Sequence, residues 1–83
     1  MHLEHILPSF AVMEEGHDVH HHSYVLIDKG KFYGMGNVPA NVTIQNLEIL
    51  KSYITAYPEN EYIRGLVYQY VAKRPENKID FKV

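Results

Sequence analysis

The 83-residue sequence contains no cysteine, which excludes thiolate zinc sites, thiol nucleophiles and the disulfide framework of a small secreted scaffold. It also lacks any stretch close to the ~18 apolar residues that a membrane-spanning helix needs. The N-terminal segment MHLEHILPSF has neither the basic flank nor the long apolar core of a signal peptide. Together these absences predict a cytoplasmic protein.

A strong excess of one charge is missing as well, because 8 Lys and Arg face 10 Asp and Glu and the net charge is −2. This balance disfavours a chain that binds nucleic acid through a net positive charge. The hydrophobic share of 46% and charged share of 22% are ordinary for a globular protein. The length predicts one domain over residues 1–83, with 1–8 as a flexible lead-in. A core this small favours support from self-association or from a larger protein.

Three short apolar segments predict a meander of strands, and they cover residues 9–14, 23–28 and 31–38. The DKGK turn offers Gly30 for a positive φ between the second and third strands. Gly34 and Gly36 lie two residues apart and predict a bare strip of backbone on one strand face. We expect a helix or a tyrosine ring to pack closely there.

The apolar period then becomes helical. It predicts a helix through Leu47, Leu50, Ile54 and Tyr57, capped by Asn41 or Thr43 and ended by Pro58. A second helix is expected from the N-cap Asn60 to Arg74, and the two helices should form a hairpin.

The C-terminal segment KIDFKV alternates apolar and charged residues and predicts a last strand with one buried face. Such a strand can add to the sheet of its own chain or to that of a neighbour. The predicted fold is therefore α+β, with a small antiparallel sheet made of the three-strand meander plus the C-terminal strand. This sheet packs against the helical hairpin, in the order βββααβ.

The segment GHDVHHHSY carries four histidines within six positions. Neutral imidazoles bind zinc or nickel, so His17, His20 and His22 are candidate ligands for adventitious metal. The spacing is not diagnostic, because functional sites usually take ligands from separate elements. A solvated connection between two strands is the favoured interpretation. No nucleophile motif and no pair of carboxylates spaced as general acid and base is evident, so we expect no enzymatic activity from this chain alone.

A basic stretch with interleaved tyrosines lies near the C-terminus and is a candidate for contacts with DNA phosphates and bases. Its cationic members are Arg64, Lys73, Arg74, Lys78 and Lys82. The favoured alternative is a solvated helix face whose C-terminal cations complement the helix dipole.

Two long stretches carry a family resemblance: PSFAVMEEGHDVHHHSYVLIDKGKFYGMGNVP and LEILKSYITAYPENEYIRGLVYQYVAKRPENKIDF. They resemble the C-terminal region of DNA polymerase III epsilon-subunit-like exonucleases of Bacteroidetes-type bacteria. In these multidomain proteins of DNA replication and repair, a 3′-5′ exonuclease and a GIY-YIG-like module precede this tail. The most telling pieces are LIDKGKFYGMG and YPENEYIRGL, which are packing and turn signatures. The chain departs from the family at residues 17–22, where the family tends to carry a charged, acidic loop.

The resemblance implies a non-catalytic accessory domain that is part of a larger protein or a free-standing relative of its tail. Neither the exonuclease carboxylates nor the GIY-YIG tripeptides are present in this sequence. Its expected roles are interdomain packing, self-association or docking on a partner, with the nuclease modules or a second copy of the chain as partners. A weak, sequence-independent DNA contact and metal binding by the histidines are the alternatives.

Overall fold

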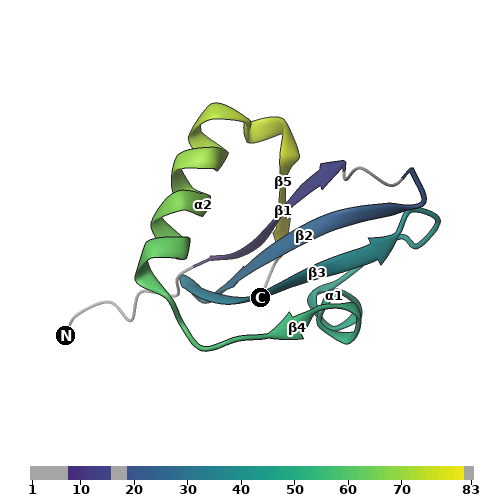
Figure 1. The fold of residues 1–83 in the computed structure, drawn as a ribbon, viewed down its shortest axis with the longest axis horizontal. Coiled ribbons are helices and arrows are strands. Elements are labelled where there is room, and N and C mark those ends of the chain that lie inside the picture. The colour runs from purple at the N-terminus through teal and green to yellow at the C-terminus, as the bar shows by residue number, and fades with distance from the viewer. Residues whose placement is uncertain (1–7, 16–18, 82–83) are drawn as a thin grey trace.

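The computed structural model describes residues 8–15 and 19–81. Its strands form one antiparallel sheet in the order β4-β3-β2-β1-β5, with two α-helices and a short 3₁₀ turn (Figure 1). The elements are β1 (Ser9–Glu15), β2 (His21–Asp28), β3 (Lys31–Pro39), α1 (Leu47–Tyr53), β4 (Thr55–Ala56), α2 (Glu61–Lys73), η1 (Pro75–Asn77) and β5 (Lys78–Phe81). The predicted α+β class, meander and C-terminal strand are confirmed. The short strand β4 was not predicted.

The two helices lie on opposite faces of the sheet and do not form the predicted hairpin (Figure 1). Successive residues of a strand point to opposite faces, so β1 sends Phe10 to one face and Ala11 to the other. Ala11 packs in the cluster that contains Leu50 of α1, whereas Phe10 packs in the cluster that contains Val67 of α2. The sheet therefore separates two small cores, which is why its central strands read as nearly continuous apolar runs.

The turn between β2 and β3 has the geometry that the sequence predicts. Lys29 has a φ of 53° and Gly30 a φ of 82°, so both central residues are left-handed, as a type I′ hairpin requires. The backbone N–H of Gly30 donates to the carbonyl oxygen of Pro8 at 3.2 Å. This bond fixes the turn to the start of β1.

Gly34 and Gly36 do leave a bare strip on β3, and the occupant is an extended backbone segment instead of a helix or a tyrosine ring. A Cβ atom on Gly36 would lie 3.0 Å from the Cα of Ile54, and one on Gly34 would collide with the carbonyl oxygen of Thr55. Because these two glycines have no side chain, β4 can pair with β3 at the edge of the sheet.

The helix ends follow from their capping residues. The Asn46 side chain accepts from the N–H of Ile49 at 2.9 Å, so Asn46 caps α1 in place of the predicted Asn41 or Thr43. α1 ends at Tyr53, several residues before Pro58, because the chain becomes extended from Ile54 on and forms β4. Asn60 caps α2 as predicted.

Candidate functional site

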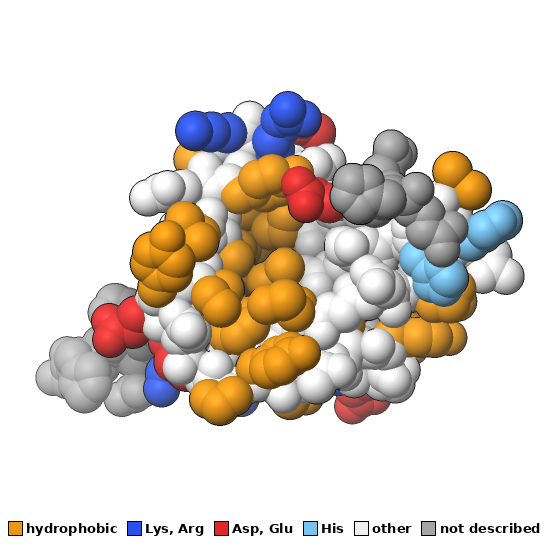
Figure 2. All heavy atoms as spheres, in the orientation of Figure 1, with side chains coloured by type: hydrophobic (Ala, Val, Ile, Leu, Met, Phe, Trp, Pro, Cys, Tyr) orange, Lys and Arg blue, Asp and Glu red, His pale blue; other side chains and the backbone are white. Residues whose placement is uncertain are grey.

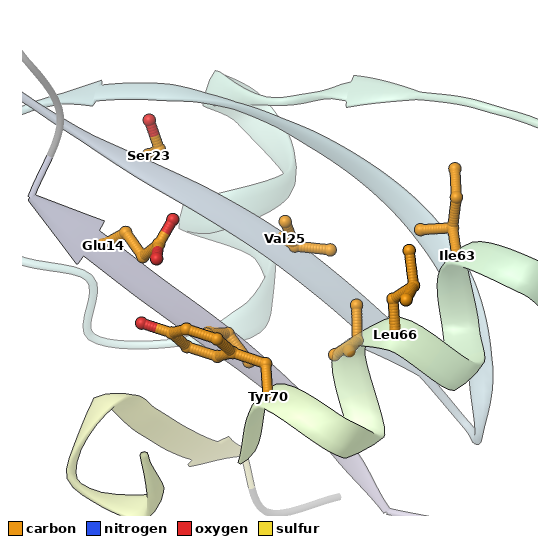
Figure 3. Close-up of a pocket in the computed structure, with 8 residues that line it drawn as sticks. Glu14, Ser23, Val25, Ile63, Leu66 and Tyr70 are labelled. Carbon is orange, nitrogen blue, oxygen red and sulfur yellow. The ribbon is translucent and has the colours of Figure 1, made fainter. Parts of the chain in front are cut away.

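A groove of about 280 Å³ runs between α2 and the sheet face that α2 covers (Figure 3). Its walls are Val12 of β1 and Val25 of β2 on one side and Ile63, Leu66 and Val67 of α2 on the other. The small side chains of the valines leave space that longer ones would fill. This site is therefore an apolar trough that is open to solvent along α2.

One end of the groove is polar. Glu14 and Ser23 lie there on neighbouring strands together with Tyr70 of α2, while Ile63 and Leu66 line the other end (Figure 3). The Tyr70 hydroxyl accepts a hydrogen bond from the side-chain amide of Asn77 at 2.8 Å, which fixes the direction of the ring. The Glu14 carboxylate is exposed and has no ion pair among the residues that the structure describes.

A second hollow of about 320 Å³ continues from this polar end and shares Glu14 and Tyr70 with the groove. It is also lined by Met13, Arg74 and Asn77. The continuous depression is thus apolar along α2 and carries both a carboxylate and a guanidinium at its end.

Three large apolar side chains of α2 are exposed, and one of them, Leu66, lines the groove. The exposed fractions are 75% for Tyr62, 46% for Leu66 and 44% for Tyr68, whose ring packs edge-on against Phe10. Figure 2 shows hydrophobic side chains gathered over α2 and the adjoining sheet on one side of the molecule. A continuous apolar surface of this kind, with polar groups at its border, is typical of a contact surface for another protein.

The predicted basic residues do not form one patch. Arg64 lies in the first turn of α2, and its guanidinium is 3.0 Å from Glu59 and 3.7 Å from Glu61. Lys73 lies in the last turn and Arg74 is the C-cap residue. At about 1.5 Å of rise per residue, more than 10 Å of helix separates Arg64 from Lys73. Arg64 is therefore too far from Lys73 to share a patch with it. The carboxylates of Glu59 and Glu61 also largely neutralise its charge.

Lys78 is also engaged within the chain. Its Nζ lies 3.1 Å from the Oδ1 of Asp80 and 4.9 Å from the centroid of the Phe10 ring. Lys82 lies outside the described residues. The cations that are exposed and lack an ion pair in the described part of this set are thus Lys73 and Arg74, at the C-terminal end of α2. DNA contact by this set stays a prediction.

The described histidines lie at the start of β2 or directly before it. His20 lies in the turn before the strand, where its carbonyl oxygen accepts from the N–H of Ala40 at 2.7 Å. His21 and His22 belong to β2, so the polar connection is shorter than predicted. Within residues 8–15 and 19–81, no group of three His, Cys, Asp or Glu is placed to hold a metal ion. His17 lies outside the described residues, so metal binding by His17, His20 and His22 stays a prediction.

Asp28, at the end of β2, is held by hydrogen bonds from Ser9 and Lys51. Burial raises the pKa of its carboxyl, but hydrogen bonds from Lys51 and Ser9 and the charges of Lys51 and Lys29 outweigh burial and lower that pKa. The Ser9 hydroxyl donates to Asp28 at 2.8 Å and is 2% exposed, so it is not poised as a nucleophile. This cluster fixes the fold and does not resemble a catalytic site.

The groove was missed at the sequence level, although its signal was present. Six apolar residues lie at helical spacing on α2, which is more than one helix of this length needs to cover one face of a small sheet. They are Tyr62, Ile63, Leu66, Val67, Tyr70 and Val71. The excess indicates an additional surface to be covered.

The fold and groove define the chain as a small α+β domain with an open apolar groove between α2 and the sheet. No helix in the described part is long and apolar enough to cross a membrane. In comparisons with protein-family models, curated proteins and solved structures, no match to the chain was found.

Proposed function

We propose that this chain is a non-catalytic accessory domain that docks through its groove on the nuclease modules of a DNA polymerase III epsilon-subunit-like exonuclease. The observation that carries the proposal is the half-exposed Leu66 beside an open apolar trough. The nuclease modules are proposed as the partner because the sequence resembles the tail that follows them in that family. The resemblance rests on segments that run through β1, β2 and α2, which are the elements that line the groove.

The chemistry of the groove specifies what it would accept. Apolar side chains of the partner would pack against Val25 and Leu66, and this burial supplies most of the favourable free energy. A basic residue of the partner would pair with Glu14, which sets the direction of the docked element. The bound surface is therefore an aliphatic segment with a Lys or Arg at one end.

Isothermal titration of the chain with the purified nuclease modules of such an exonuclease tests the proposal. We expect saturable binding that Leu66→Glu weakens at least tenfold, because a carboxylate in the groove must be desolvated. The matched control is Ala72→Glu, which adds the same charge at an exposed position on the opposite side of α2. Circular dichroism should show both variants folded.

Two results would overturn docking through the groove. One is the absence of binding at concentrations of ~1 mM, because linked modules meet at effective concentrations in the millimolar range and a functional contact between them must be populated there. The other is an equal loss of affinity in Leu66→Glu and Ala72→Glu, since the effect would then come from charge alone.

A further inference from the structure

β5 forms one edge of the sheet and is the longer of the two edge strands. At the opposite edge, β4 has two residues, whereas β5 has four. β5 pairs with β1 on its inner side, and no described strand pairs with its outer side. It contains no proline and no bulge, so its outward N–H and C=O groups can accept another strand.

The charges of β5 are arranged symmetrically about Ile79, with Lys78 before it and Asp80 after it. Proteins often protect an edge strand with charged residues, because pairing then brings like charges together. Two antiparallel copies of β5 centred on Ile79 escape this penalty. Each Lys78 stands opposite Asp80 of the second copy, and the two Ile79 residues stand opposite each other.

The registers centred on either charged residue of β5 are unfavourable. Centring the pair on Lys78 places the two lysines opposite each other, and centring it on Asp80 does the same for the two carboxylates. A shift by one residue would turn the second sheet over. The face covered by α1 in one copy would then continue into the face covered by α2 in the other. Among the registers centred on Lys78, Ile79 or Asp80, the sequence of the edge therefore favours the one centred on Ile79.

The two faces of β5 agree with this register. Ile79 stands opposite Ala11 in the β1–β5 pair and packs on the core under α1, yet it stays partly exposed. Phe81 lies on the same face and is also partly exposed. α1 packs against β3, three strands away in the sheet, so a second copy would extend this apolar face.

We propose that the chain forms a two-fold symmetric dimer in which the β5 strands of two copies pair antiparallel about Ile79, giving one continuous ten-stranded sheet. The edge shares no residue with the groove, so the dimer does not depend on the proposed function. Within each chain the Nζ of Lys78 lies 3.1 Å from Asp80 and 4.9 Å from the centroid of the Phe10 ring, so pairing requires the Lys78 side chain to turn from Phe10 towards the second copy. In the dimer each lysine lies between two carboxylates.

Complementary charge variants test the register directly. Lys78→Asp and Asp80→Lys each place like charges opposite each other in the dimer and should be monomers, with dimerisation weakened at least tenfold. When the two variants are mixed, every opposite pair again joins a cation and a carboxylate. We expect native mass spectrometry to show wild-type homodimers and, in the mixture, heterodimers in excess of both homodimers. The contact of residue 78 with residue 80 within a chain stays broken in both variants, so it cannot explain the rescue.

A cysteine provides a second measurement, because the chain contains no other. Ile79→Cys should form a disulfide-linked dimer under mild oxidation, since residues directly opposite in antiparallel strands have Cα atoms about 4.5–5.5 Å apart. Thr55→Cys at the opposite edge is the control and should form far less. A wild-type chain that sediments as a monomer at ~1 mM would overturn the proposal, as would a mixture without heterodimers. A dimer lost in Leu66→Glu but unaffected by the charge variants would place the contact at the groove and refute the edge.

Discussion

The Nζ of Lys51 in α1 lies 2.8 Å from the Oδ2 of Asp28 at the end of β2. The other carboxylate oxygen accepts from the Ser9 hydroxyl at 2.8 Å, and Ser9 in turn accepts from the backbone N–H of Lys29 at 3.0 Å. One carboxylate therefore holds the start of β1, the end of β2 and α1 together. Most of this network is shielded, because the side chains of Lys51 and Asp28 are 31% and 17% exposed.

Asp28 should make stability depend on pH in the acid range. Its folded-state pKa lies below the ordinary value of 3.8, so its contribution is fully present above that value and is lost as the pH falls through the folded-state pKa. We expect Asp28→Asn to lower the free energy of unfolding by ~1 kcal/mol at neutral pH. The difference from wild type should shrink towards zero in strong acid. Urea unfolding at a series of pH values measures it.

The control for Asp28 is Glu76→Gln, which removes an exposed carboxylate in η1. This variant should follow the wild-type stability curve at every pH. A constant difference between Asp28→Asn and wild type down to the lowest pH would contradict the assignment.

Gly65 should tolerate a side chain and gain stability from it. Apart from its chain neighbours and the backbone of its own helix, no described atom lies within 4 Å of the position that a Cβ would take, and the residue sits inside α2. We expect Gly65→Ala to raise the free energy of unfolding by ~0.5–1 kcal/mol, because alanine loses less backbone entropy in a helix. Gly34→Ala is the contrasting variant and should destabilise, since its Cβ collides with Thr55. Thermal and urea unfolding distinguish the two directions.

Glu59 should contribute more to the free energy of unfolding than the nearby Glu61. Its Oε1 accepts from the backbone N–H groups of Phe32 at 2.9 Å and Asn60 at 3.0 Å, and its Oε2 pairs with Arg64. We expect Glu59→Ala to cost ~1–3 kcal/mol, because the N–H of Phe32 loses its partner where β3 begins. Glu61→Ala is a matched control, since its 85% exposed carboxylate lies 3.7 Å from Arg64 and should contribute less than ~0.5 kcal/mol. Equal losses would contradict the role of Glu59.

The chain should bind DNA weakly at most. Arg64 and Lys78 are paired with carboxylates, and the net charge is −2. In fluorescence anisotropy we expect no binding of single-stranded DNA at physiological salt. Replacing Arg64, Lys73 and Arg74 by alanine should therefore leave the anisotropy of the DNA unchanged. Salt-sensitive binding that this triple variant abolishes would favour the alternative of a DNA-contacting module.

Local chemistry made several elements predictable. The apolar strands, the turn at Gly30 and the cap at Asn60 depend on neighbours in sequence, and the structure confirms them. The relative placement of the helices depends on the sheet between them, and periodicity cannot say which face a helix covers. The helical spacing of Leu47, Leu50 and Ile54 continued past the true end of α1, because β4 is selected by the bare strip of β3.

The groove depends on distances that no local pattern contains. Leu66 and Val67 are adjacent, apolar and equally suited to a core, yet their exposed fractions are 46% and 8%. Adjacent residues of a helix point about 100° apart, so Val67 faces the sheet while Leu66 lies on the flank of α2 beside the groove. The sequence supplied the candidates, and only the packing separated core from surface.

β1 contributes side chains to both cores, one on each face of the sheet. This restricts where insertions and deletions can occur in the gene. Phe10 and Val12 belong to one core while Ala11 belongs to the other, so inserting or deleting one codon within β1 would exchange the side chains of the two cores. A phenylalanine would then have to fit where an alanine is fully enclosed. In homologous genes, length variation should therefore be confined to the connections, such as residues 40–46, and be excluded from β1.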